Sequence, residues 1–498
     1  MTPRCVLFSC AFLLYAAQVV SASTQRVFTS DPTSLNRTGT LHRFTLDNSH
    51  DLKEIINDAL SHDLDIWRIT QTHVDIYFPV TDTPRESPLP WSLRTSSRIV
   101  NPIYHSNVEP SPLGSLSGSA VDQWNLSSLT NTSYHSVYHP LYEIDSFVHE
   151  MAKAYPEEAS VVHLGHSAEG REMLGLKLAR VPPENNDDDK PEKGPEKPGK
   201  ERTLDPTKKL GFVIMGAQHA REWVATATSL YLAHALVTNR TEDGSLSDLL
   251  EVFDFYIIPT PNPDGYDYTW ESDRFWYKNR QIMGPNAKCI GLDMNRNWGY
   301  KWKAHVIGGG PTFDDEDLVD YDLSDLSDPE SSFKKNKPPK EPVDPCSHWY
   351  PGHRPFEAPE ANNIANYMTT LPNLVAFVDL RSYGQMLSLP YSYSCKRMPK
   401  DAEDMMEAAL GAVRALKNVH GTDFTTGTLC DLLYKAPGNV IDWMYKKVGI
   451  KYTYAVHLRD TGTYGFSLPA QWIRPVGEET GNMIAYLGKF IATQMKRA

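Results

Sequence analysis

The sequence predicts an α/β protein whose main unit is a mixed, largely parallel, twisted sheet with helices on both faces. The first observation is alternation: an apolar, strand-like run over 210–215 is followed by helical spacing over 222–237, within a main unit expected to begin near residue 135. Strands that alternate with helices are typical of parallel sheets with functional residues at the strand ends. The second observation is length, since 498 residues leave room for a smaller, additional unit.

Three shorter segments precede the main unit. Residues 1–22 contain Arg4, an apolar run and small residues near Ala22, which predicts a secretory signal; the alternative, a membrane anchor, needs about 20 apolar residues. Residues 23–80 are predicted to form a small α+β unit, because 41–80 shows a strand, helix, strand, strand pattern; it is either a prosegment or an accessory domain. Residues 81–134, rich in Ser, Pro and Asn, are predicted to be an exposed connector and processing region.

The main unit is predicted to span 135–498. Two charged, Pro-rich stretches near 182–208 and 311–343 are expected to be surface insertions. A net charge of −13 argues against a nucleic-acid partner, which needs a concentrated basic face. Beyond the signal we expect no transmembrane segment.

The cysteines and sequons fit an oxidising compartment. Without the signal, four cysteines remain and predict two disulfides, with three pairings open: Cys289, Cys346, Cys395 and Cys430. Four N-x-Ser/Thr sequons predict glycosylation, at Asn36, Asn125, Asn131 and Asn239. The sequence therefore predicts a secreted protein.

A candidate metal site follows the run 210–215. His219 and Glu222 are spaced so that an imidazole and a carboxylate can converge on one ion. Alone, His-x-x-Glu is more often a surface pair than a ligand pair. Its place after a buried strand favours a site, because open α/β sheets bind ligands at the carboxyl ends of their strands.

Three longer motifs, over 216–223, 291–298 and 458–466, resemble those of the pancreatic-type zinc carboxypeptidases. The similarity covers about 135–498, and the 41–80 unit resembles the inhibitory prosegment of that family. The resemblance implies a carboxypeptidase-like fold, one Zn²⁺, a peptide or protein C-terminus as ligand, and the chain's own prosegment as a partner. The chain is also similar to fungal inactive carboxypeptidase-like proteins, which implies a link to cell-wall organisation and a vacuolar or secreted location.

The resemblance also implies roles for single residues. His219 and Glu222 fall on two zinc ligands, and Asp293 on the carboxylate that orients the ligand imidazole. Asn295 and Arg296 fall on the clamp for the terminal carboxylate of the substrate.

The remaining implied positions concern the walls of the site and the disulfides. Tyr434 matches a mobile tyrosine that closes over the substrate, and Ile441 matches the floor of a pocket for an apolar last residue. Ser382 and Tyr383 complete the implied substrate-binding set. The implied disulfides are Cys289–Cys346 and Cys395–Cys430.

Three positions depart from the pattern of an active enzyme. Arg381 stands where the third zinc ligand is expected, and a guanidinium has no lone pair for a metal. His457 replaces the catalytic glutamate, whose general-base assistance is worth about 10²–10⁴ in rate. Tyr277 replaces an oxyanion-stabilising arginine, worth about 10²–10³. We therefore expect weak zinc binding and little or no peptidase activity.

Several alternatives stay open at this level. His457 is able in principle to serve as an unusual base or ligand. Arg381 is able to pair with Glu222 in place of the metal. Three kinds of protein are therefore compatible with the sequence. The first is an inactive protein that keeps the carboxylate clamp, the second is an active zinc carboxypeptidase that releases apolar C-terminal residues, and the third is a structural glycoprotein with a vestigial site. Retention of Asn295, Arg296 and Tyr434 favours the binding role over the vestigial site.

Overall fold

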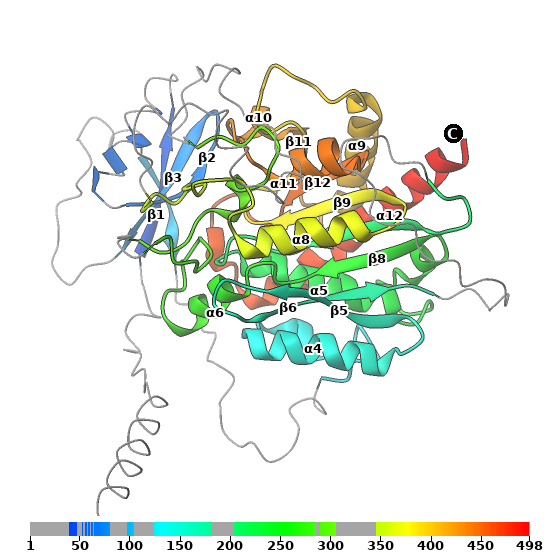
Figure 1. Cartoon of the computed structure of the whole chain (residues 1–498). Coiled ribbons are helices and arrows are strands. Elements are labelled where there is room, and N and C mark those ends of the chain that lie inside the picture. The colour runs from blue at the N-terminus through cyan, green and yellow to red at the C-terminus, as the bar shows by residue number, and fades with distance from the viewer. Residues whose placement is uncertain are drawn as a thin grey trace, which may run out of the picture.

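The computed structural model describes residues 39–46, 64–79, 97–103, 124–180, 204–284, 289–304 and 345–497, with part of 52–62 (Figure 1). The predicted signal over 1–22, and the predicted insertions apart from 204–208, lie outside the described residues. No helix in the described part of the chain is long and apolar enough to span a membrane.

The main unit is built on an eight-stranded mixed sheet of order β11-β10-β12-β9-β7-β8-β6-β5. Its centre, β12-β9-β7-β8, is parallel, whereas β5, β6 and β10 bring in antiparallel pairs. The predicted fold class is confirmed. The strands are β5 Ala159–His166, β6 Glu172–Leu178, β7 Leu210–Met215, β8 Phe253–Ile258, β9 Leu374–Arg381, β10 Met386–Leu389, β11 Thr425–Thr428 and β12 Tyr452–His457.

Helices cover the sheet on both sides, with α8 in front of it and α5 and α12 behind it in the view of Figure 1. Every residue of β9 is buried, as expected for a central strand covered on both faces. In α4 the buried residues recur at helical spacing and form one apolar face. The helices are α4 Leu141–Ala154, α5 Trp223–Val237, α6 Pro263–Glu271, α8 Pro359–Thr370, α9 Ala402–His420, α10 Leu429–Leu432, α11 Val440–Trp443 and α12 Ile473–Arg497.

The small N-terminal unit has a four-stranded sheet of order β2-β3-β1-β4. Three of its strands match the predicted pattern: β1 Gly39–Thr45, β2 Asp65–Ile69 and β3 His73–Pro79. Ile55, Ile56 and Ala59 lie on the helical segment between β1 and β2 and are buried in its core.

The structure differs from the expected connector over 81–134 at two places. Residues Ser97–Ile103 form β4, which pairs with the outer side of β1. Pro102 is compatible with this position because an edge strand leaves one row of backbone groups outside the ladder. Further on, Trp124, Leu126 and Leu129 are buried in the core of the main unit, which therefore begins before residue 135.

Candidate functional site

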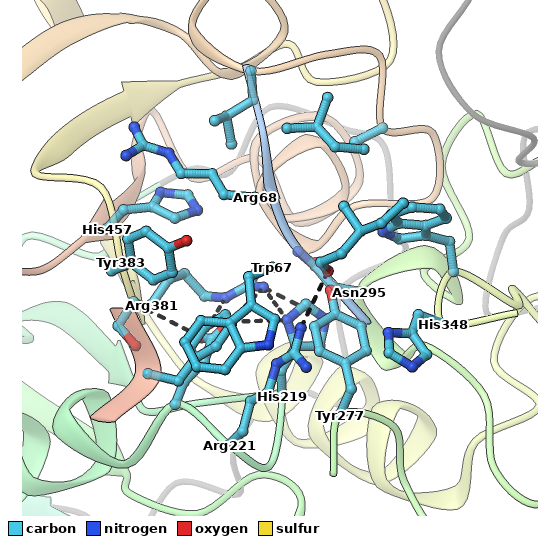
Figure 2. Close-up of a pocket in the computed structure, with 18 of the residues that line it drawn as sticks. Trp67, Arg68, His219, Arg221, Tyr277, Asn295, His348, Arg381, Tyr383 and His457 are labelled. Carbon is cyan, nitrogen blue, oxygen red and sulfur yellow. Dashed lines mark hydrogen bonds and ion pairs between the residues drawn. The ribbon is translucent and has the colours of Figure 1, made fainter. Parts of the chain in front are cut away.

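A cavity lies at the carboxyl ends of the central strands, where the motif residues converge (Figure 2). His219 and Glu222 follow β7, Arg381 is the last residue of β9, and His457 is the last residue of β12. Arg381 and His457 are register partners in the parallel pair β9–β12, so both stand at the same level of the sheet. The predicted placement after the end of a strand holds for His219 and Glu222.

The two expected zinc ligands are buried and adjacent. His219 and Glu222 are each 2% exposed, and His219 Nδ1 lies 3.0 Å from Glu222 Oε1. His219 Nε2 lies 2.8 Å from Asp293 Oδ1, so Asp293 contacts the imidazole in the way the resemblance implies.

Arg381 lies between these two side chains. Its Nε donates to Glu222 Oε2 at 3.0 Å, its Nη1 donates to Asp379 Oδ2 at 3.3 Å, and its Nη2 is within hydrogen-bonding distance of His219 Nδ1. The ion pair between Arg381 and Glu222, one of the alternatives left open by the sequence, is present.

Arg381 and His219 both contact the carboxylate of Glu222, and the far side of the His219 ring faces Asp293. Burial alone would raise the pKa of Glu222, but Arg381 and His219 hold it at about 2. The carboxylate is therefore charged at neutral pH and neutralised by an internal cation.

These residues do not fit a zinc ion. His219 Nδ1 and both oxygens of Glu222 already face N–H groups of Arg381, which repels a second cation. Among the described residues, no group of three or more His, Cys, Asp or Glu side chains could hold a metal. Structural and catalytic zinc sites need at least three such ligands.

His457 is a poor general base in this position. It is 8% exposed, and its Nδ1 has no hydrogen-bond partner among the described residues. Burial and the nearby Arg381 lower the pKa of His457 to about 3. An efficient base at neutral pH needs a pKa near 7, so the neutral imidazole accepts a proton only weakly.

Tyr277 brings an aromatic ring where an active enzyme is expected to have a cation. Its ring stacks on His219 with centroids 3.7 Å apart and on His348 with centroids 5.8 Å apart. The guanidinium of Arg221 lies 4.9 Å from the centre of the same ring. The ring packs the cavity wall and supplies no charge to stabilise an oxyanion.

The clamp residues Asn295 and Arg296 lie together on the cavity wall. Arg296 Nη2 donates to the hydroxyl of Tyr434 at 2.8 Å, and Nη1 donates to the backbone oxygen of Asn295 at 3.0 Å. Arg296 Nε is buried without a partner among the described residues. Asn295 Oδ1 accepts from the backbone of Val440 at 3.0 Å. Tyr434 thus lies against the end of Arg296.

The three remaining predicted site residues lie in three different places: on the cavity wall, against the small unit and in the main core. Ser382 lines the cavity, and its backbone N–H donates to Glu222 Oε2 at 3.3 Å. The Tyr383 hydroxyl donates to Asp75 of the small unit at 2.8 Å. Ile441 is fully buried in the main core and is not among the described residues that line the cavity.

The small unit closes the cavity, and its contacts include residues that the sequence reasoning missed. Arg221 Nη1 donates to both oxygens of Asp65, at 3.0 and 2.7 Å. Asp75 is fully buried and accepts two bonds from Arg43, at 2.7 and 2.8 Å. One available signal for Arg221 was its place between His219 and Glu222 in the motif.

An aromatic cluster joins the two units beside these ion pairs. Trp67 of the small unit lies 5.0 Å from the ring centres of both Phe275 and Phe466 of the main unit. Both units contribute buried residues to this cluster: Leu41, Trp67, Tyr77, Phe275, Tyr383 and Phe466. Burial of this apolar area stabilises the closed arrangement.

The disulfides Cys289–Cys346 and Cys395–Cys430 are both present, as the resemblance implies. Three of the four predicted sequon asparagines are exposed, Asn125, Asn131 and Asn239, whereas Asn36 lies outside the described residues. Glycosylation of these residues stays a prediction.

The chain belongs to the zinc carboxypeptidase family, since a model of that family matches residues 144–483. Two fungal relatives are each named inactive metallocarboxypeptidase ECM14. The relative from Blastomyces gilchristii is 31% identical over 477 residues, which is 90% of this chain and 71% of the relative. The relative from Ajellomyces capsulatus is 32% identical over 479 residues, which is 90% of this chain and 70% of the relative. The resemblance read from the motifs is confirmed.

Solved structures agree with this assignment. The thrombin activatable fibrinolysis inhibitor is 27% identical with a TM-score of 0.67, and the match covers 92% of this chain and 99% of that one. Carboxypeptidase A from Helicoverpa armigera is 22% identical with a TM-score of 0.66 over 92% of this chain and 99% of that one, which shows the shared fold.

Proposed function

We propose that this chain is a zinc-independent, carboxypeptidase-like protein that has lost peptidase activity and binds a peptide or protein C-terminus. The observation that carries the proposal is the position of Arg381, whose guanidinium contacts both His219 and Glu222. A cation supplied by the chain keeps the two side chains in place without an ion. The relatives named inactive metallocarboxypeptidases support the loss of activity.

The surroundings of the reacting centre support the same proposal. Hydrolysis needs a base that activates water and a positive group that stabilises the oxyanion. The resemblance assigns those positions to His457, whose pKa is lowered to about 3, and to Tyr277, whose ring is uncharged. The full chain is expected to release no apolar C-terminal residue above background. Turnover that Glu222→Ala abolishes would contradict this, whereas the triple change Arg381→His, His457→Glu and Tyr277→Arg is expected to restore some turnover.

Recognition of a terminal carboxylate requires no metal. Among the described residues Arg296 Nε has no partner, and Nη2 donates to Tyr434, so movement of the Tyr434 side chain would make a second donor available. An arginine fork binds a carboxylate through two parallel hydrogen bonds. Asn295 lies beside Arg296 on the same wall and completes the proposed clamp.

Calorimetry with matched peptides tests the clamp. A peptide with an apolar last residue and a free C-terminus is expected to bind more tightly than its C-terminal amide. Because charge-assisted hydrogen bonds contribute about 1.5–3 kcal/mol, Arg296→Ala should weaken binding of the acid roughly tenfold or more. Arg240→Ala is the control, since Arg240 is 69% exposed in its pair with Asp248. Equal affinity for acid and amide would instead favour the structural glycoprotein with a vestigial site.

Two further parts of the proposal rest on the resemblance to the fungal proteins. These are a role in cell-wall organisation and a secreted or vacuolar location. The two disulfides are compatible with secretion. Immunolocalisation of the tagged full chain in its source cells tests the location, and a cytosolic signal would contradict it.

A further inference from the structure

Residues 124–139 form a strap that lies against the main unit ahead of α4. The structure describes every residue of this strap, which contains no strand and one short 3-10 helix, Tyr134–Ser136. Trp124, Leu126 and Leu129 of the strap are buried in the main core. A segment outside the sheet opens more readily than a central strand, because fewer backbone hydrogen bonds must break together.

Two buried imidazoles join the strap to α5. His135 of the strap is 2% exposed, and His234, in the last turn of α5, is fully buried. His135 Nε2 lies 3.1 Å from His234 Nδ1, and His234 Nε2 lies 2.8 Å from the backbone oxygen of Leu126. A carbonyl oxygen only accepts, so His234 Nε2 carries a hydrogen. In the neutral pair His234 Nδ1 therefore accepts from His135 Nε2.

This contact limits the number of protons that the closed strap can hold. One added proton makes a buried cation that the two rings share. A second proton would set one N–H group against another at the 3.1 Å contact and break it. Imidazoles that are released to water each take up a proton near their ordinary pKa of 6.5. The open strap therefore binds more protons than the closed strap, so a fall in pH favours opening.

The main charged neighbour of the pair opposes a proton on either ring. Arg474 of α12 donates to the backbone oxygens of Leu129 and Thr132 on the strap. Burial is the largest cause that lowers the pKa of both His135 and His234, to about 4 for His234, and the charge of Arg474 lowers both further. The closed pair is therefore neutral over the range in which the released rings become charged.

Glu242, in the turn after α5, favours a charged His234 but is held by other groups. Its Oε1 accepts from Ser128 Oγ at 2.6 Å and from the backbone N–H of Thr130 at 2.8 Å. Burial would raise the pKa of Glu242, but these hydrogen bonds lower it to about 2. Glu242 therefore stays charged while the two imidazoles titrate.

The other titratable side chains that face the two rings are Tyr134, His139, Tyr155 and Tyr231. The three tyrosines stay neutral in acid, because burial raises the pKa of each. His139 differs from the pair, since its Nδ1 lies 2.6 Å from Glu143 Oε2 and its Nε2 lies 2.7 Å from the backbone oxygen of Tyr134. Both of its nitrogens face acceptors, so a charged His139 keeps its contacts.

We propose that the contact between His135 and His234 is an acid-sensitive switch, which lets the strap open away from α5 when the chain enters an acidic compartment. Opening makes a segment accessible that is buried at neutral pH, at the start of the main unit. The inference goes beyond the carboxylate clamp and does not depend on it, because neither imidazole is among the described residues that line the site cavity.

Hydrogen exchange of the full chain, measured by mass spectrometry from neutral to mildly acidic pH, tests the switch. Each proton taken up on opening raises the opening constant about tenfold per pH unit, so two protons raise it about a hundredfold. After correction for the intrinsic pH dependence of exchange, peptides from 124–136 are expected to show a rise between these limits below pH 6.5. Strand β9 should exchange far more slowly than the strap throughout.

Two variants assign this rise to the imidazoles. His135→Gln and His234→Gln each remove one titrating ring, so each should lower the slope by about tenfold per pH unit, to nearly zero where the closed pair already shares one proton. His163→Gln, at a ring that is 58% exposed, is the matched control and should leave the slope unchanged.

The unmodified chain decides the proposal even where a variant does not fold. A slope in 124–136 well below about tenfold per pH unit would overturn the switch. A full slope that persists in both His135→Gln and His234→Gln would also overturn it, because other groups would then take up the protons. Exchange of the strap and β9 at one common rate would show global acid unfolding and no local switch.

Discussion

Two buried arginines in one cavity are neutralised in different ways. Arg381 pairs with Glu222 and Asp379, which belong to the same unit and lie at its central strands. Arg221 pairs with Asp65, which the small N-terminal unit supplies. The first ion pair lies within the main unit, whereas the second joins the two units. The difference shows that the charge of Arg381 is compensated within the main unit, whereas that of Arg221 is compensated by the docking of the small unit.

The largest expected effect is on stability, at Arg381. Arg381→Gln leaves Glu222 buried without its cation, and removal of one partner of a buried ion pair costs about 3–5 kcal/mol. The midpoint of urea unfolding should fall accordingly. Arg240→Gln, at a 69% exposed side chain, should leave the midpoint nearly unchanged. A loss at Arg381 no greater than that of the control would mean that the ion pair does not hold the site together.

The sequence predicted the fold and the site best where the relevant residues lie close together along the chain. The run 210–215 coincides with β7 because an unbroken apolar strand is easily recognised, and the motifs placed His219 and Glu222 at its end. The sequence left the ion pair of Arg381 open, because its partner Glu222 is 159 residues away along the chain. A local sequence pattern does not indicate a contact between residues that are so far apart along the chain.

Other features were missed for the same physical reason. The partner of Arg221 lies 156 residues earlier, in a different unit, so the role of Arg221 follows only from the docking of the two units. Strand β4 was missed because Ser97, Asn101 and Pro102 are typical of loops, and its pairing with β1 stabilises it as an edge strand.

A smaller effect is expected at the contact between the two units. Asp65→Asn removes charge-assisted hydrogen bonds to Arg221, worth about 1.5–3 kcal/mol, and screening favours the lower value because Asp65 is 20% exposed. Hydrogen exchange should become faster in β2, whereas β7 should remain protected. The control is Asp248→Asn. Equal acceleration in β2 and β7 would show that the ion pair stabilises the whole chain and would remove the contrast with Arg381.

Acidification provides a graded test at His457. Its pKa is lowered from 6.5 to about 3 in the folded chain, so between these values the unfolded chain binds one more proton than the folded chain. The contribution of His457 to stability is therefore present above pH 6.5 and falls by about 1.4 kcal/mol per pH unit as pH decreases to 3. His457→Gln should lose less stability over this range in urea titrations. Identical pH profiles would mean that His457 is not held neutral by burial and Arg381.

Metal analysis of the purified full chain beside Arg381→His tests most directly whether an internal guanidinium has replaced the zinc ion. After dialysis against a metal-free buffer with a trace of zinc, the unmodified chain is expected to hold far less than one zinc per molecule. Arg381→His supplies a third ligand beside His219 and Glu222 and should approach one zinc per molecule. One tightly held zinc in the unmodified chain, lost in His457→Ala, would contradict the account.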